Sequence, residues 1–308
     1  MNRIINIIIL TGLFSISNVV VGKALSTSVS EGDIINVTLS ELVPTQFSIG
    51  FDQIFYKLGR FDKDKKKMFD EICKTNGQKG IASFNKHSTA HDPQTFSCKK
   101  TVGTVKKEMK TVVIAPNGRY YLTDGHHTLN VFWAMSEGGS EFKVNVIVDK
   151  DYRNLNSMDS FWKQMVSDGN TWLFDQQGNP LTYHNLPASL GMENFANDQY
   201  RSLVYFSRNV AWSKPKISVP FLEFYWATEL YKQLDIAQLD LNSKSGYEQA
   251  IMKVSHVILA LESNDVGRSG KSVKEMGQFS QLNQKGLDKL LRAKKGKISY
   301  MINYKNNL

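Results

Sequence analysis

Residues 111–129 constrain the fold more than any other segment, because strand, turn and helix signals follow one another with almost no spacing. Residues 111–115 form an apolar, β-branched run that predicts a strand, and residues 116–118, Pro-Asn-Gly, predict a turn. Residues 119–123 are then the returning strand of a hairpin. A helix is predicted over residues 126–136, before two glycines. The segment therefore predicts a hairpin that leads directly into a helix.

The junction between this hairpin and the helix suits an anion. The first N–H groups of a helix lack intrahelical partners and carry the positive end of the helix dipole. Asp124 is a candidate helix cap, which we favour, or a carboxylate for metal binding or proton transfer. Gly125 lets a ligand approach the backbone. His126 and His127 point about 100° apart, so one can face a ligand in acid–base chemistry, and the alternative is a structural hydrogen bond.

The remaining pattern predicts an α+β protein. Residues 34–39 and 142–148 alternate as strands, and residues 50–58 have helical spacing. We expect a small α/β unit over residues 25–155, packed on a mainly helical C-terminal half over residues 156–308. The helices expected in that half span residues 158–166, 198–206, 220–234 and 247–262.

The N-terminus has the pattern of a secretory signal peptide. A positively charged start precedes an apolar run, and small residues follow it, so we expect cleavage after residue 24. Polar residues interrupt the run, which argues against a retained membrane anchor. The mature protein is then expected to be exported, periplasmic or secreted, with no transmembrane span.

The chain has two cysteines, Cys73 and Cys98, and a disulfide between them is expected after export. The alternative is two free thiols. Residues 75–110 are polar, lysine-rich and aperiodic, and they indicate a long loop or an insertion that the cysteine pair would fasten.

The formal charge of +9 is concentrated in lysine runs. Such patches suit nucleic acid, lipid headgroups or an anionic substrate, and each run alone is equally compatible with a solvated surface. These runs lie at residues 63–67, 99–100, 106–110 and 292–297.

Several motifs, in this order, resemble the ParB-like nuclease family of the ParB/sulfiredoxin superfamily. The resemblance covers most of the mature chain, and the lysine-rich stretch departs from it as an apparent insertion. The motifs are Pro44-Thr45-Gln46, Gly50, Lys57, Asp124-Gly125-His126-His127-Thr128, Asp198-Gln199-Tyr200-Arg201-Ser202-Leu203 and Pro220-Phe221-Leu222-Glu223-Phe224-Tyr225-Trp226-Ala227.

The resemblance implies a small α/β fold whose loop-to-helix junction grips the phosphates of a nucleotide or another phosphorylated ligand. Branches of the superfamily include DNA-partitioning CTPases, sulfiredoxin and nucleotide-dependent serine kinases. Sulfiredoxin-like repair is disfavoured, because that branch has a reactive cysteine in the motif where this chain has Asp124 to Thr128.

Candidate site residues follow from side-chain chemistry within these motifs. Lys57 and Arg201 suit a phosphate, and their alternative role is a surface ion pair. Glu223, among aromatic residues, is expected either to pair with Arg201 or a site histidine or to be a base of raised pKa. Neutral hydrogen bonds to the ligand are expected from Thr45 and Gln46, and Gly125 and Thr128 belong to the phosphate grip.

We therefore expect an exported protein that binds a phosphate-containing ligand, as a nuclease or phosphodiester hydrolase. The catalytic candidates are Asp124, His126, His127 and Glu223. A divalent metal at the two histidines is compatible with such chemistry, although its ligands are not identified. The alternatives are a non-catalytic nucleotide or nucleic-acid binding module and a nucleotide-dependent phosphotransferase of the serine-kinase type.

Overall fold

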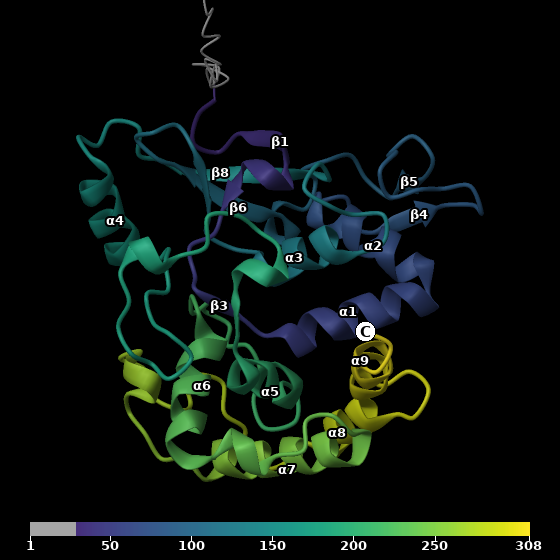
Figure 1. The fold of residues 1–308 in the computed structure, drawn as a ribbon, viewed down its shortest axis with the longest axis vertical. Coiled ribbons are helices and arrows are strands. Elements are labelled where there is room, and N and C mark those ends of the chain that lie inside the picture. Colours follow the sequence, from purple (N-terminus) through teal and green to yellow (C-terminus); the bar gives the residue numbers. More distant parts are fainter. Residues whose placement is uncertain (1–28) are drawn as a thin grey trace, which may run out of the picture.

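A long helix, α1 (Phe51–Lys63), lies between a lobe built on a β-sheet and a lobe built of helices (Figure 1). The computed structural model describes residues 29–308, so the predicted signal peptide of residues 1–24 lies outside the described residues. The architecture is α+β, as the sequence predicts. No helix within residues 29–308 has the length and apolarity needed to cross a membrane.

The sheet of the first lobe has five strands and mixed directions. The hairpin predicted from residues 111–123 is confirmed, with Val113 opposite Tyr121. One edge strand runs antiparallel to its neighbour, and the two inner strands β8 (Lys143–Asp151) and β6 (Lys110–Ile114) run parallel to each other. The strand order is β1 (Ile34–Thr38), β8 (Lys143–Asp151), β6 (Lys110–Ile114), β7 (Tyr120–Leu122) and β2 (Leu42–Val43).

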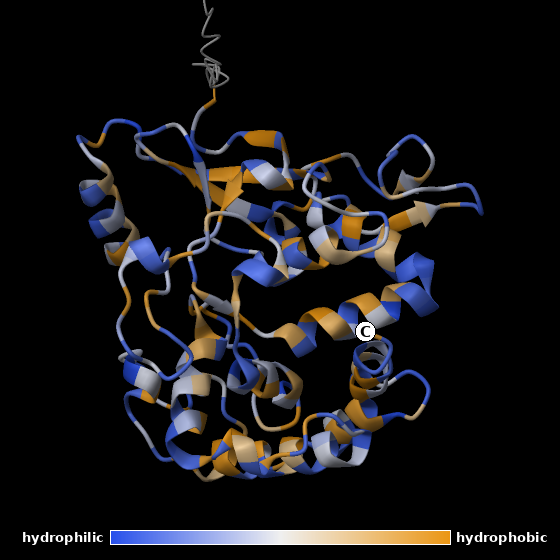
Figure 2. Cartoon of the chain, in the orientation of Figure 1, coloured by the Kyte–Doolittle hydropathy of each residue, from blue (hydrophilic) through white to orange (hydrophobic). Residues whose placement is uncertain are grey.

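Helices cover both faces of this sheet. Val112 and Ile114 point to the side of α2 (Lys65–Thr75) and α3 (His126–Ala134), where they join one apolar core. Val113 points to the other side and packs in a second core beneath α4 (Met158–Ser167). This alternation follows from the period of two in a strand, and Figure 2 shows hydrophobic residues concentrated along the sheet.

The segment after α1 contains more structure than the sequence predicts. Helix α1 continues to Lys63, and α2 follows it after a single residue, Asp64, whose side chain caps α2. The disulfide predicted between Cys73 and Cys98 is present, with Cα atoms 5.6 Å apart. It joins α2 to a small two-stranded sheet of β4 (Ile81–Ser83) and β5 (Ser97–Cys98).

The second half is helical, as expected. The helices are α5 (Gln199–Ser207), α6 (Leu222–Gln233), α7 (Lys244–Ala260), α8 (Gln284–Leu291) and α9 (Lys297–Lys305). The last two lie in the basic C-terminal part of the chain, for which no helix was expected. Two short parallel strands, β3 (Ser48–Ile49) and β9 (Ala196–Asn197), connect this half to the start of α1.

Helix α1 belongs to two hydrophobic cores. Ile54 and Leu58 pack in the core of the sheet lobe, whereas Tyr56 packs in the core of the helical lobe. On the helical side α1 lies against α9 at Gly59, where a Cβ atom would lie 2.4 Å from the carbonyl oxygen of Tyr300. The close contact between α1 and α9 therefore requires glycine at this position.

Candidate functional site

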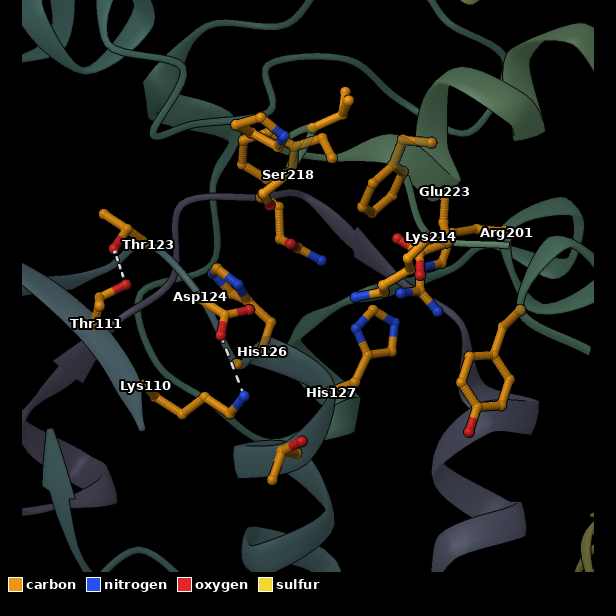
Figure 3. A pocket seen from close by; sticks show the side chains of 18 of the residues that line it. Lys110, Thr111, Thr123, Asp124, His126, His127, Arg201, Lys214, Ser218 and Glu223 are labelled. Atoms are coloured by element: carbon orange, nitrogen blue, oxygen red, sulfur yellow. Dashed lines mark hydrogen bonds and ion pairs between the residues drawn. The ribbon is translucent and has the colours of Figure 1, made fainter. Parts of the chain in front are cut away.

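A cavity of about 420 Å³ opens where the sheet lobe meets the helical lobe (Figure 3). Its wall includes the start of α3, one face of α1, and the segment from α5 to α6. The predicted site residues on this wall are Gln46, Lys57, Asp124, Gly125, His126, His127, Thr128, Arg201 and Glu223. The fold thus brings together motifs that are up to 177 residues apart in the sequence, since Gln46 and Glu223 share one cavity.

Helix α3 begins with free backbone donors beside this cavity. Its N-cap is Gly125, whose left-handed conformation (φ 105°) leaves no side chain to cap the helix. The first intrahelical bond runs from the Leu129 N–H to the Gly125 carbonyl. Within residues 29–308, the N–H groups of the three preceding residues have no hydrogen-bond acceptor. These donors and the helix dipole favour an anion at this end.

Asp124 does not cap α3, contrary to the role that we favoured from the sequence. Its carboxylate is exposed and pairs instead with the Lys110 ammonium at 3.1 Å. Burial of the carboxylate on one side opposes ionisation, but the charge of Lys110 outweighs it and lowers the pKa of Asp124. Gly125 is the N-cap instead, because the residue before the helix has a left-handed conformation that glycine adopts without strain.

His126 is a buried, neutral hydrogen-bond acceptor. Its Nε2 atom accepts a hydrogen bond of 3.0 Å from the Thr45 backbone N–H. Since a backbone N–H can only donate, the ring proton of the neutral imidazole is on Nδ1. Burial lowers the pKa of His126 to about 3. Near neutral pH this residue therefore holds two segments together and carries no charge.

His127 has the same protonation state but a different partner. Its Nε2 atom accepts a hydrogen bond of 2.9 Å from the Gly50 backbone N–H, at the start of α1. Burial, together with the charge of Arg201, lowers the pKa of His127 well below its ordinary value. Figure 3 shows its ring beside Arg201 and Lys214 on the cavity wall. The neutral ring thus offers a donor, Nδ1–H, and its Nε2 lone pair is already occupied.

The cavity wall is rich in positive charge. Arg201 is buried, with 6% of its surface exposed, and it donates from Nη1 to the side-chain oxygen of Gln53. Its Nε atom is buried without a partner in the described chain. Five cationic side chains line the cavity against three carboxylates. The cations are Lys57, Lys110, Arg201, Arg208 and Lys214, and the carboxylates are Asp124, Asp149 and Glu223.

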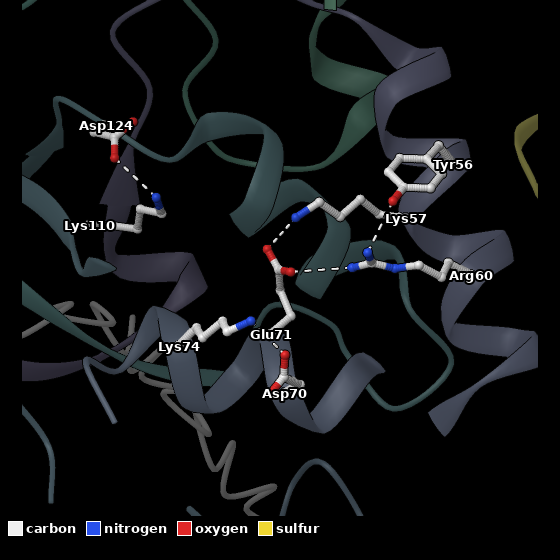
Figure 4. Close-up of polar contacts among 8 residues, drawn as sticks. All are labelled: Tyr56, Lys57, Arg60, Asp70, Glu71, Lys74, Lys110 and Asp124. Carbon is white, nitrogen blue, oxygen red and sulfur yellow. Dashed lines mark hydrogen bonds and ion pairs between the residues drawn. The ribbon is translucent and has the colours of Figure 1, made fainter. Parts of the chain in front are cut away.

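Lys57 is already paired within the protein (Figure 4). Its ammonium contacts the carboxylate of Glu71, and the same carboxylate forms an ion pair of 3.4 Å with the Arg60 guanidinium. Burial opposes ionisation of Glu71, but the charges of Lys57 and Arg60 prevail and lower its pKa. The ion pair expected as an alternative for Lys57 is thus present, although it is largely buried and borders the cavity.

Glu223 is ionised rather than held as an acid of raised pKa. Burial opposes its ionisation, but the charges of Arg201, Lys214 and Arg208 outweigh it and lower the pKa of Glu223. Its ion pair is with Arg208, at 3.7 Å, whereas the sequence suggested Arg201 or a histidine. Arg201 nevertheless contributes the largest attractive charge.

Thr45 lies behind the cavity, and Gln46 and Thr128 lie on its wall. Thr45 is fully buried, and its hydroxyl donates to the Leu122 carbonyl at 2.6 Å. Its contact with the site passes through His126. Gln46 donates from its side chain to the Ser48 carbonyl at 2.7 Å.

Sequence reasoning missed three cations of the wall as site residues. Lys110 was noted within a basic run, and Arg208 and Lys214 were not considered. Arg208 follows Arg201 by seven residues, which is about two helical turns and places both on one face. That spacing could have identified Arg208. Lys214 belongs to an irregular segment, and no periodic pattern marks it.

A divalent metal at the two histidines would need further ligands beside them. Within residues 29–308, no three His, Cys, Asp or Glu side chains converge as ligands. The Nε2 atoms of both site histidines accept backbone N–H groups, which removes them as donors to a metal. The two histidines therefore do not supply, through Nε2, the metal site considered from the sequence.

Comparison with known proteins places this geometry in a family context. The family model described as "Putative ParB-like nuclease" matches residues 35–232, more than half of the chain. The crystal structure of protein Atu1540 from Agrobacterium tumefaciens is similar in fold, with a TM-score of 0.51 and 21% sequence identity. That similarity covers 75% of this chain and 93% of the other. No curated protein matches the sequence.

Proposed function

Because the chain belongs to the ParB-like nuclease family, we propose that its cavity binds a phosphate-containing ligand and hydrolyses a phosphodiester bond in it. The observation that carries the proposal is the convergence of free helix N–H groups, a neutral imidazole donor and five cationic side chains on one cavity. A cavity of about 420 Å³ is in the usual size range for a small ligand. It suits a nucleotide or one unit of a nucleic acid.

Each group on the wall has a role that its hydrogen bonds allow. The N–H groups at the start of α3 and the Nδ1–H of His127 donate to phosphate oxygens. Arg201 and Lys214 balance the charge that develops on these oxygens in the transition state. His126 positions the start of α3 through Thr45 and does not contact the ligand through Nε2.

We assign the role of proton acceptor to Glu223. It is an ionised carboxylate on the cavity wall, whereas both imidazoles are neutral with occupied Nε2 atoms. In hydrolysis, a water oxygen attacks phosphorus, its proton passes to Glu223, and the bond from phosphorus to the leaving oxygen breaks. The leaving oxygen then takes a proton from solvent.

Turnover tests this function. Purified protein should release products from plasmid, single-stranded DNA, RNA or a simple phosphodiester, and Glu223→Gln should reduce the rate by about 100-fold or more. Phosphate binding by Glu223→Gln should persist, because this change removes a negative charge. Binding without turnover in both proteins would favour the non-catalytic module, and transfer of a phosphoryl group to an alcohol would favour the phosphotransferase.

We also propose that the protein is exported. The support is the N-terminal signal pattern together with the disulfide between Cys73 and Cys98, which persists in oxidising compartments. Expression of the full chain in its host should yield a mature N-terminus near residue 25 outside the cytoplasm. An intact N-terminus in the cytoplasm with free thiols would contradict export.

A further inference from the structure

We propose that a second phosphate subsite adjoins the cavity, formed by Lys297, Arg60 and Arg208 around the rings of Tyr56 and Tyr205. The inference rests on the proposed function and makes it more specific, because the ligand would then carry two linked phosphates. One phosphate would occupy the start of α3, and the next would lie toward α9. The source of the second phosphate is either a diphosphate group or the adjacent unit of a polynucleotide.

Lys297 is a cation without a carboxylate partner. Its Nζ atom lies 4.5 Å from the ring centroid of Tyr205 and 5.6 Å from that of Tyr56, and no ion pair joins it to an acid in the described chain. Aromatic faces attract a cation only partially. Burial, and then the positive charges of Arg208, Lys57 and other cations, lower the pKa of Lys297 to about 7. An anion at this place would remove that repulsion.

The two arginines of the subsite also retain unused donors or weak partners. Arg60 donates to the Tyr56 hydroxyl at 3.0 Å and contacts Glu71 at 3.4 Å, while its buried Nε atom has no partner in the described chain. The guanidinium carbon of Arg208 lies 4.9 Å from the ring centroid of Tyr205. Its ion pair with Glu223 is 3.7 Å long.

The charges of this cluster do not balance. Among residues 29–308, the cations Lys57, Arg60, Arg208 and Lys297 form ion pairs with two carboxylates, those of Glu71 and Glu223. Unpaired charges that lose contact with water destabilise a protein, so an excess of this kind is costly in the absence of an anion. A phosphate supplies the missing negative charge and several hydrogen-bond acceptors.

The subsite is continuous with the cavity. Lys57, Tyr205 and Arg208 line the cavity themselves, and the Tyr205 ring contacts Lys297. Figure 4 shows Lys57, Arg60 and Tyr56 of α1 linked by contacts through Glu71 of α2. Lys297 is the first residue of α9 and lies outside residues 35–232, which the family model matches. The second phosphate would therefore be held partly by a helix that the family match does not include.

The test compares affinities for inorganic phosphate and pyrophosphate in the mature protein, measured by calorimetry without metal. In the wild type the second phosphate should raise the affinity by about tenfold or more. Lys297→Met should remove most of this ratio, and Lys297→Arg should restore part of it. Lys295→Met is the matched control, because it removes one exposed lysine charge nearby and should keep the ratio.

A set of three nucleotide probes identifies the source of the second phosphate. Thymidine 5′-monophosphate is compared with thymidine 5′-diphosphate and with the 5′-phosphorylated dinucleotide. If Lys297→Met lowers the gain in affinity from the second phosphate for the dinucleotide alone, the subsite binds the adjacent unit of a polynucleotide. If it lowers that gain for the diphosphates alone, the subsite binds a diphosphate group. An equal ratio in wild type and Lys297→Met overturns the subsite. Absence of binding by every probe overturns the proposed function itself.

Discussion

The two histidines that begin α3 are adjacent in sequence, yet each accepts a backbone N–H from a different segment of the chain. His126 accepts a hydrogen bond from the Thr45 N–H, and His127 accepts one from the Gly50 N–H, five residues further along the chain. The pair thereby fixes the start of α3 against the connection that leads from β2 into α1. Both rings are kept neutral by this arrangement, so a phosphate bound as proposed would meet hydrogen-bond donors rather than imidazolium charges.

His126 should make stability depend on pH in the acid range. Its pKa is about 3 in the folded protein and near 6.5 when unfolded. The unfolded chain therefore binds more protons between these values, and the free energy of unfolding should fall as the pH drops from 6.5 toward 3. Urea denaturation from pH 7.5 to pH 4 measures this dependence. His126→Gln keeps an acceptor for Thr45 and should show a shallower decline; equal slopes in both proteins would contradict the argument.

His127→Ala should weaken phosphate binding by about tenfold, because one donor leaves the cavity. The same change leaves the Gly50 N–H without its acceptor, which should lower the free energy of unfolding by about 1 to 3 kcal/mol. His127→Gln restores an acceptor and should recover most of the stability. Calorimetric titration with inorganic phosphate and urea denaturation separate the two effects. Unchanged affinity in the folded alanine variant would remove His127 from the site.

Residue types in local motifs were sufficient to find much of this wall. Asp124 to Thr128, Lys57, Arg201 and Glu223 all line the cavity. The sequence could not predict which cation pairs with Glu223, because Arg208 and Arg201 approach this carboxylate only after α5 and α6 pack. Lys214 was missed for a related reason, since only tertiary folding brings its irregular segment to the wall.

At the scale of elements, patterns of period two and 3.6 identified the strands β1, β6, β7 and β8 and most of the helices. They did not predict the edge strand β2, because its two residues lie directly before Pro44 in a segment that reads as a break. They also missed α2, which begins with three lysines, and both α8 and α9 in the basic C-terminal part of the chain. The buried residues Met68, Phe69, Ile72 and Cys73 do follow helical spacing in α2, but the run of lysines before them suggested a solvated segment. The partner that stabilises α9 is α1, which lies more than 230 residues earlier, so local propensity carried little signal.

Gly59→Ala should disturb the contact between α1 and α9. A methyl group would lie 2.4 Å from the Tyr300 carbonyl oxygen, which belongs to the backbone and cannot rotate away. Because this overpacks the contact between the helices, we expect a loss of about 1 to 3 kcal/mol in the free energy of unfolding. Lys63→Ala, at an exposed position in the same helix, should change it by less than about 0.5 kcal/mol. A neutral or stabilising Gly59→Ala would show that the two helices can separate without cost.

At the scale of the whole molecule, the disulfide closes the long polar segment onto the sheet lobe. Cys73 and Cys98 are 25 residues apart. In the chain-entropy model, a loop of this length contributes about 3 kcal/mol. Replacing both cysteines by serine should lower the free energy of unfolding by about that amount, measured by urea denaturation. Phosphate affinity should change little, because neither cysteine lines the cavity; a large loss of affinity would show that the segment shapes the site.

The dual membership of α1 in both cores has a consequence for how the chain can be divided. A fragment that ends with the family match at residue 232 would lack α9, and the side of α1 that carries Tyr56 and Gly59 would face water. Such a fragment should fold poorly on its own, and it should tend to associate through the exposed apolar side of α1. The two lobes should accordingly melt in a single cooperative transition, with neither surviving as a separate foldon.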